Sequence, residues 1–325
     1  MHDGCGIGNT PDGGRNVEEA GTDKKVDVLI NVCGKPYQTA LALLTLERAS
    51  GHRIDRIYFV EENTQHHNVD IHTGHHGFVL DRLKEKIVYL RPETWNYCFS
   101  IELDRLGDEQ YRHSVRYQYG WEKSDKDHVL IIHNDAHFHG DVVGAMLDNI
   151  GGHIAIGHVG QCWYCPAAFT GRCGPDSYLE YKPSFRELRD LYTKTRAPEG
   201  SLMRAYHLPR MHPMFEKQPW PLPECRVNEW CALIDMKKAR GITAPHGRVT
   251  PFGAILSVGK QILDVGCQWF RDVHVRGHTC KNFDIYKYMH HDVPPTGQPT
   301  LLDRERYEQR EIEALARLRE EFGHP

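Results

Sequence analysis

The chain has 325 residues, of which 40% are hydrophobic and 26% are charged, and its formal net charge is -4. This balance is typical of a globular protein and excludes a largely disordered chain. No basic stripe stands out, so we expect no nucleic-acid partner, and no apolar run approaches the ~18 to 20 residues of a transmembrane segment.

The first 25 residues predict a disordered tail. Five glycines fall within the first fourteen residues, and segment 1–25 contains no apolar core of the kind that a secretion signal needs. We therefore expect a cytoplasmic protein whose ten cysteines are mainly reduced.

The first half of the chain alternates between strand and helix patterns. Good helix formers predict helices at 38–50 and 111–124. Apolar runs predict strands at 26–32, 56–60, 87–90 and 129–132. Such alternation favours an α/β fold with a mixed, mostly parallel sheet flanked by helices.

The pattern changes in the second half. After a predicted strand at 154–159, residues 161–223 are rich in Cys, Pro, Tyr and Arg, and we interpret them as an excursion from the sheet. Within it, Ser184 and Glu187 form the capping-box pattern of a helix at 184–195. Further strands are predicted at 231–236 and 286–289, and a charged helix at 300–322.

The segment 127–141 is the most informative part of the sequence. A short apolar run leads directly into Asn134, Asp135 and His137. In open α/β sheets, ligands bind beyond the carboxyl ends of the strands. Oxygen and imidazole donors at such a place suit a divalent ion, Mg²⁺ or Mn²⁺, that holds phosphates.

Four segments together resemble an inverting nucleotide-sugar glycosyltransferase of the GT-A fold, close to glycosyltransferase family 2. The strand at 28–32 with the loop 33–37 is similar to the opening strand and donor loop. The run Ile57 to Asn63 is similar to the second strand with its acidic end. Residues 116–121 and 129–137 are similar to the helix and strand that lead into the metal-binding Asp-x-Asp motif, although this chain has Asp-x-His in its place. Residues 262–291 are similar to the segment that carries the catalytic base.

The resemblance implies a GT-A-like fold, a nucleotide-sugar donor, and a glycan, lipid-linked, protein or small-molecule acceptor. It implies a donor half at 26–160, an acceptor and catalytic half with a Cys-rich insertion at 161–299, and a C-terminal helix at 300–325. The implied metal ligands are Asp135, His137, His290 and His291. The implied donor-binding residues are Cys33, Gly34, Lys35, Pro36, Glu61, Glu62, Arg116 and Asn134.

The catalytic base has two candidates. In the family pattern a carboxylate precedes a helix ending in Gly, and a His follows about fourteen residues later, as Asp264, Gly277 and His291 do here. Glu229 is the competing carboxylate. A positioned base of this kind contributes roughly 10²- to 10⁴-fold to the rate of proton transfer from an acceptor hydroxyl.

The cysteines raise a separate possibility. Cys162, Cys165 and Cys173 have spacing that suits three ligands of a structural Zn²⁺, with Cys225, Cys231 or a His as the fourth. Buried free thiols are the alternative.

Two other functions compete with the transferase. If residues 133–139 formed one strand, His133, His137 and His139 would share a face near Asp135, as in a zinc hydrolase. The Asp-x-His departure also allows a non-catalytic protein of the same fold that binds a sugar or nucleotide.

Overall fold

The computed structural model describes residues 24–63, 75–94, 100–196, 211–259, 261–291 and 303–325. The predicted disordered tail, 1–25, lies outside these ranges except for Lys24 and Lys25. Of the helices within the ranges, none has the length and apolar character needed to cross a membrane.

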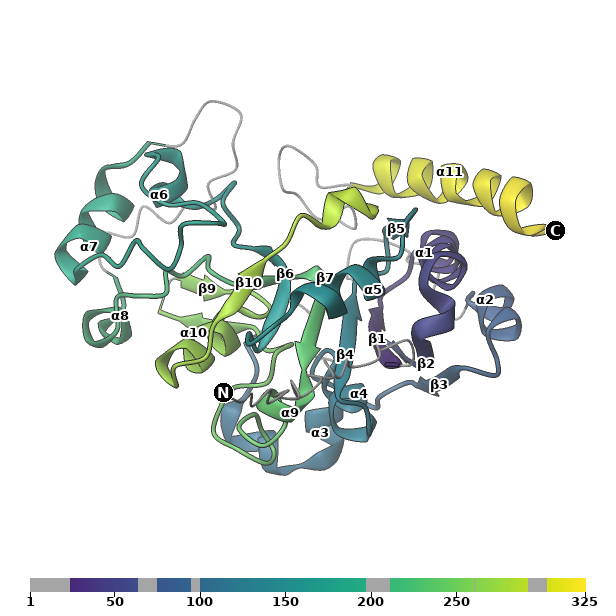
Figure 1. Ribbon diagram of the computed structural model, residues 1–325, viewed down its shortest axis with the longest axis horizontal. Helices are drawn as coiled ribbons and strands as arrows, with labels where there is room; N and C mark the ends of the chain where they lie inside the picture. The colour runs from purple at the N-terminus through teal and green to yellow at the C-terminus, as the bar shows by residue number, and fades with distance from the viewer. Residues whose placement is uncertain (1–23, 64–74, 95–99, 197–210, 260, 292–302) are drawn as a thin grey trace, which may run out of the picture.

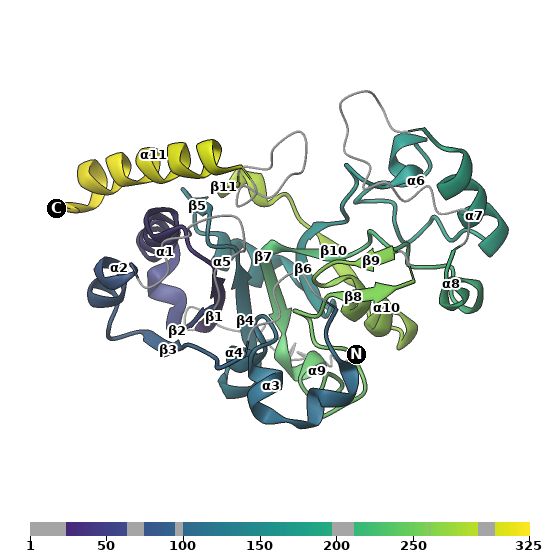
Figure 2. The same ribbon diagram turned by 180° about the vertical axis from the view of Figure 1, so that it is seen from behind.

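A seven-stranded sheet forms the centre of the molecule (Figures 1 and 2). Six of its strands point the same way, and β7 runs antiparallel to both of its neighbours. In spatial order the strands are β10 (Cys280–Asn282), β6 (Ala155–Val159), β7 (Val227–Asp235), β4 (His128–Ile132), β1 (Val26–Val32), β2 (Ile54–Glu61) and β3 (Ile87–Leu90). The predicted mixed, mostly parallel sheet is confirmed.

Helices cover both faces of this sheet, which explains why its central strands are mainly apolar. All seven residues of β1 are buried. Strands that are buried on both faces form near-continuous apolar runs rather than alternating ones. The two polar residues of β1, Asp27 and Asn31, accept hydrogen bonds from neighbouring elements. On one face lie α1 (Pro36–Ser50) and α5 (Val142–Asn149), and α11 (Arg304–Phe322) packs against α1. The other face packs on α4 (Gln118–Lys123) and α10 (Cys267–Val275). α9 (Met236–Ala239) directly follows β7, and α7 (Phe185–Lys194) belongs to the excursion after β6.

Two small sheets and several short helices complete the described structure. β5 (Ala136–Phe138) pairs antiparallel with β11 (Met289–His291), and β8 (Leu256–Val258) pairs with β9 (Gln261–Leu263). The excursion between β6 and β7 carries α6, α7 and α8 at the end of the molecule opposite α11 (Figure 1). The short helices are α2 (Gly77–Arg82), α3 (Glu109–His113), α6 (Pro166–Phe169) and α8 (Pro213–Lys217). The capping box predicted for α7 is present.

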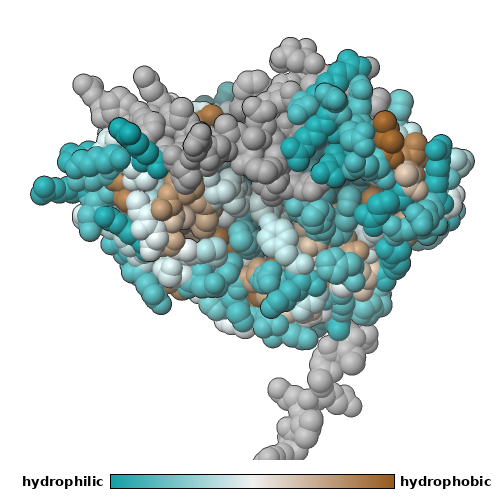
Figure 3. Space-filling model, turned by 90° about the horizontal axis from the view of Figure 1, so that it is seen from above, coloured by the Kyte–Doolittle hydropathy of each residue, from teal (hydrophilic) through white to brown (hydrophobic). Residues whose placement is uncertain are grey.

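The surface seen in Figure 3 is mostly hydrophilic, and its hydrophobic residues form small separate patches. Among the described residues, the most exposed large apolar side chains belong to different helices, with Ile312 on α11 and Val275 on α10. Isolated apolar residues of this kind are normal on a soluble surface.

Two predicted elements were wrong. The segment 111–124 is not one helix, because α3 ends at His113 and α4 begins at Gln118. Between them Tyr117 adopts a left-handed conformation, with φ of 65°, and its N–H donates to the Asn31 side chain. This tertiary contact outweighs the local helix propensity. The strand predicted at 286–289 is also wrong, because Ile285–Lys287 form a 3-10 turn and the strand there, β11, begins only at Met289.

A buried ion pair joins α3 to α4. The Arg112 guanidinium donates to both carboxylate oxygens of Glu122, at 2.7 and 3.1 Å, and Gln118 and His113 also contact this carboxylate. Burial alone would raise the pKa of Glu122, but the hydrogen bonds from His113, Arg112 and Gln118 outweigh it and lower the pKa to about 2.

We expect Glu122→Gln to lower the free energy of unfolding by about 3 kcal/mol at pH 7, the amount that corresponds to this pKa change. A lowered folded-state pKa stabilises above the ordinary value near 4.5, and this stabilisation is lost as the pH falls toward 2. Urea unfolding of both proteins between pH 7 and pH 3 should therefore show a difference that narrows with acid.

The control variant is Glu109→Gln, because the Glu109 carboxylate is 61% exposed and pairs with Lys123 at the surface. Exposed pairs contribute roughly 0 to 1 kcal/mol. A loss of equal size at pH 7 and pH 3 in Glu122→Gln would contradict the electrostatic explanation.

Candidate active site

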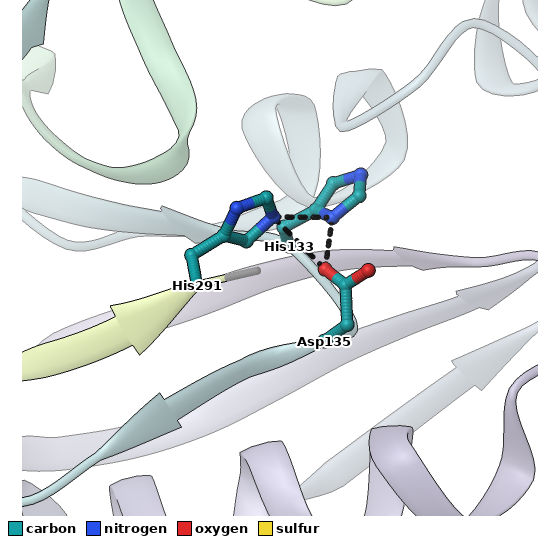
Figure 4. A group of neighbouring side chains, drawn as sticks. All are labelled: His133, Asp135 and His291. Atoms are coloured by element: carbon teal, nitrogen blue, oxygen red, sulfur yellow. Dashed lines mark hydrogen bonds and ion pairs between the residues drawn. The ribbon is translucent and has the colours of Figure 1, made fainter. Parts of the chain in front are cut away.

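Asp135 lies in the turn that follows β4, at the carboxyl edge of the sheet. β4 ends at Ile132, and residues 133–135 turn the chain into β5. The pairing of β5 with β11 sets His291 opposite Ala136, beside Asp135. Figure 4 shows His133, Asp135 and His291 pointing toward one another from these two segments.

The three side chains meet at one carboxylate oxygen. Oδ1 of Asp135 lies 3.0 Å from Nε2 of His291 and is hydrogen-bonded to Nδ1 of His133. The two imidazole nitrogens are 3.2 Å apart. All three ligand atoms lie within 4.8 Å of one another, and in the described part of the chain this is the group of three whose spacing suits a metal ion.

Lys35 holds the second oxygen of the same carboxylate. Its Nζ lies 2.5 Å from Oδ2 of Asp135, and both side chains are more than nine-tenths buried. Burial alone would raise the pKa of Asp135, but the charges of Lys35, His133 and His291 outweigh burial and hold the pKa well below its usual range. Burial lowers the pKa of His291 despite the opposing charge of Asp135. A neutral imidazole beside an ionised carboxylate is the form that binds metal.

The ligand types fit some divalent ions better than others. Two of the three atoms are imidazole nitrogens, whereas Mg²⁺ prefers an all-oxygen environment. Imidazole suits first-row transition ions, and carboxylate and water suit Mn²⁺. Of the two expected ions, Mn²⁺ is therefore the better fit.

A second chain of polar contacts joins the predicted donor and catalytic residues. The guanidinium Nε of Arg116 donates to Glu62 at 3.0 Å, and the adjacent Tyr117 hydroxyl donates to Glu229 at 2.9 Å. Burial, together with the charge of Glu229, raises the pKa of Tyr117 well above its usual value, so this hydroxyl keeps its proton.

The chain continues across β7 to the predicted base. Arg226 lies 3.8 Å from Glu229 and 3.3 Å from Asp264, and it is almost fully buried. Gln161 donates to Oδ2 of Asp264 at 2.9 Å, and the Val265 N–H donates to Oδ1 at the same distance. Glu62, Arg116, Glu229 and Asp264, which lie far apart in the sequence, thus belong to one network.

The predicted donor loop is held from the C-terminal helix. Gly34 and Lys35 both have positive φ, at 62° and 53°, and the Lys35 N–H donates to the Tyr307 hydroxyl at 2.8 Å. The buried Glu311 carboxylate accepts hydrogen bonds from the Tyr37 and Gln38 N–H groups at the start of α1, at 2.9 and 3.2 Å. Residues of α11 thereby fix the loop that presents Lys35 to Asp135.

The remaining predicted donor residues lie near this loop. Cys33 is buried between Glu62, Arg116 and Lys35, and burial raises the pKa of its thiol. Glu61 accepts a hydrogen bond from the Tyr89 hydroxyl at 2.7 Å, and Asn134 donates to Thr39 at 3.3 Å. Pro36 is the first residue of α1.

No family model matches the sequence, and no curated protein matches it significantly. Among solved structures, the chain is similar to the mannosyltransferase PcManGT from Pyrobaculum calidifontis, in complex with GDP-Man and Mn²⁺. The identity is 11%, the TM-score is 0.43, and the alignment covers 93% of this chain and 66% of that one.

Mouse xyloside xylosyltransferase 1, in its apo form, is 13% identical with a TM-score of 0.41, over 81% of this chain and 86% of that one. The galactosyltransferase LgtC, in complex with donor and acceptor sugar analogs, is 13% identical with a TM-score of 0.31, over 66% of this chain and 59% of its own. At these identities and TM-scores, the similarity assigns neither a family nor a reaction to this chain.

The structure does not bring all four predicted metal ligands together. Asp135 and His291 meet, but His290 is exposed, and Nδ1 of His137 lies 3.4 Å from Arg317 of α11. The partner that joins them instead is His133. The strand on which His133, His137 and His139 were to share a face does not exist, since residues 133–135 form a turn between β4 and β5.

Sequence reasoning also missed two residues of the polar network. Tyr117 and Arg226 both link predicted site residues, yet neither has a sequence signal of its own. The signal for His133 was available, since it stands two positions before Asp135 as His137 stands two after. Which of these two histidines contacts the Asp135 carboxylate depends on the residue at which β4 ends.

Proposed function

We propose that the chain is a glycosyltransferase that moves a sugar from a nucleotide-diphosphate donor to an acceptor hydroxyl, with inversion at the anomeric carbon. The observation that carries the proposal is the meeting of His133, Asp135 and His291 beside Lys35 at the carboxyl edge of the sheet. The proposal extends to the two halves, 26–160 for the donor and 161–299 for the acceptor.

The residues present divide the chemistry between them. His133, Asp135 and His291 would hold a divalent ion, which when bound supplies a Lewis acid for the leaving diphosphate. Lys35 and Arg116 place two cations near the donor loop, where they can contact phosphate oxygens. Asp264 would take the proton of the acceptor hydroxyl, whose oxygen attacks the anomeric carbon opposite the leaving group.

Of the two candidate bases, Asp264 is the better one, because its side chain is the more exposed to solvent. Its side chain is 18% exposed, whereas Glu229 is more deeply buried behind the Tyr117 hydroxyl. In this arrangement Glu229 is a positioning residue that helps to fix Arg226, which in turn contacts Asp264.

A thermal unfolding series with nucleotide diphosphates tests the donor site. A ligand at about a hundred times its dissociation constant adds about 2.7 kcal/mol of stability and raises the midpoint visibly. We expect UDP, GDP or dTDP to raise the midpoint with Mn²⁺ and much less without it. No shift with any nucleotide, with or without Mn²⁺, would contradict the proposal.

A zinc hydrolase remains the second candidate, because two imidazoles and one carboxylate are also the ligand set of hydrolytic zinc sites. The same series separates the two, since a hydrolase of this kind would be stabilised by Zn²⁺ and not by nucleotides. Stabilisation by a nucleotide without turnover of any sugar donor would indicate a binding protein.

A further inference from the structure

We infer that Cys162, Cys165, Cys173 and Cys225 form a structural zinc site at the base of the excursion between β6 and β7. All four line one small cavity of about 10 Å³. Three of them have the spacing that predicts zinc, and the fold brings the fourth from fifty-two residues further along the chain. This inference is independent of the proposed function.

Backbone hydrogen bonds bring the two ends of the excursion together. The Gly160 N–H donates to the Arg226 carbonyl at 2.7 Å, and the Gln161 N–H donates to the Glu224 carbonyl at 2.9 Å. Because residues 160–161 run beside 224–226, Cys162 and Cys225 lie close together at the start and the end of the excursion. The Cys165 N–H donates to the Cys162 carbonyl, which closes the Cys-x-x-Cys segment into a turn.

The fold decides between the two candidates for the fourth ligand. Cys225 lines the same cavity as Cys162, Cys165 and Cys173. Cys231 lies within β7, opposite Ile132 of β4, and is not one of the residues that line the cavity. The fold thus selects Cys225 over Cys231 as the fourth ligand.

Zinc would draw these thiols inward. The four sulfur atoms of a tetrahedral zinc site lie roughly 3.8 Å apart, since each Zn–S bond is about 2.3 Å. In the described structure the only group of three or more potential ligands within 4.8 Å is the His133 cluster, so the cysteine cavity must contract on binding. Besides the cysteines, its lining includes the small residues Gly160, Ala168 and Gly174, together with larger ones such as Tyr178 and Glu224.

The proposed zinc site lies next to two residues that contact the Asp264 carboxylate. Gln161, which donates to Asp264, precedes Cys162 directly, and Arg226, which pairs with Asp264, follows Cys225 directly. A metal bound between Cys162 and Cys225 would fix these two partners of the Asp264 carboxylate. We therefore expect loss of the metal to loosen residues 161–226 in hydrogen exchange while the central strands stay protected.

The test is the zinc content of the full-length chain after exposure to Zn²⁺ and dialysis against a weak chelator. Asp135→Asn is measured in parallel, so that zinc held by the His133 cluster is not counted. We expect about one zinc in Asp135→Asn, as for a closed four-cysteine site. Adding Cys225→Ala should remove at least about nine-tenths of it, and adding Cys231→Ala, the matched control, should not.

Two measurements on proteins with all four cysteines keep the test decisive if a variant fails to fold. Cobalt in place of zinc should give the ultraviolet charge-transfer band of thiolate ligands, which imidazole and carboxylate ligands do not produce. Titration of the thiols with a mercurial should release the zinc as these four react. The inference would be overturned if Asp135→Asn contained no zinc, or if the zinc were retained without Cys225. It would also be overturned if the cysteines resisted alkylation until they were reduced, because that would show disulfides.

Discussion

Replacement of Asp135 by Asn is expected to reduce sugar transfer on the order of a thousandfold. In the proposed site this carboxylate is the shared partner of His133, His291 and Lys35, so the substitution removes the one anionic ligand. Lewis-acid stabilisation of a leaving group is worth several kcal/mol, and each 1.36 kcal/mol corresponds to tenfold in rate. Initial rates with saturating Mn²⁺ and the donor identified by thermal unfolding measure the effect.

The two histidines that flank Asp135 make this prediction specific. His133 contacts the Asp135 carboxylate, whereas His137 faces Arg317. His133→Ala should raise the Mn²⁺ concentration needed for half-maximal activity by tenfold or more, and His137→Ala should leave it within about twofold. A larger effect in His137→Ala than in His133→Ala would assign the metal to Asp135 and His137. If both variants lost activity but needed the same Mn²⁺ concentration as the unmodified protein, the metal would not be bound at this site.

Asp264→Asn is expected to lower kcat by roughly 10²- to 10⁴-fold, the contribution of a positioned general base. The nucleotide affinity should change little, because Gln161, Arg226 and the Val265 N–H, which contact Asp264, do not belong to the donor loop. Steady-state kinetics combined with nucleotide titration separates the two quantities. Partial recovery in Asp264→Glu would support a base over a purely structural carboxylate.

Glu229→Gln is the companion variant for this prediction. Its carboxylate accepts from Tyr117 and lies 3.8 Å from Arg226, so the substitution keeps the shape but weakens the support of Asp264. We expect a smaller loss than in Asp264→Asn. If Asp264→Asn keeps activity within a few-fold and Glu229→Gln loses it, Glu229 is the base.

Much of the sheet could be predicted because its strands have a simple chemical requirement. The predicted bounds of β1 and β3 agree with the structure, since both strands are rich in Val, Leu and Ile. In β1 the polar Asp27 and Asn31 are accommodated because their side chains accept hydrogen bonds. The α7 capping box was equally local. The break between α3 and α4 at Tyr117 could not be predicted, because the Asn31 side chain that fixes it belongs to β1, which is distant in the sequence.

The candidate site divides in the same way. Asp135 was identifiable because a carboxylate directly after a buried strand stands at a ligand-binding edge. The choice of His133 over His137 depends on where β4 stops, and element ends are set by tertiary contacts as well as local sequence. Arg226 and Tyr117 act by linking residues from different strands, which no spacing along the chain records.

The hold of α11 on the donor loop affects the order in which the molecule can be completed during its synthesis. Lys35 is translated 272 residues before Tyr307, and Glu311, which also secures its loop, follows Tyr307. Until they arrive, the first turn of α1 lacks the carboxylate that its N–H groups bind. All seven strands of the central sheet precede α11 in the sequence, so a product that stalls between β11 and α11 would have the sheet without the contacts that secure the donor loop.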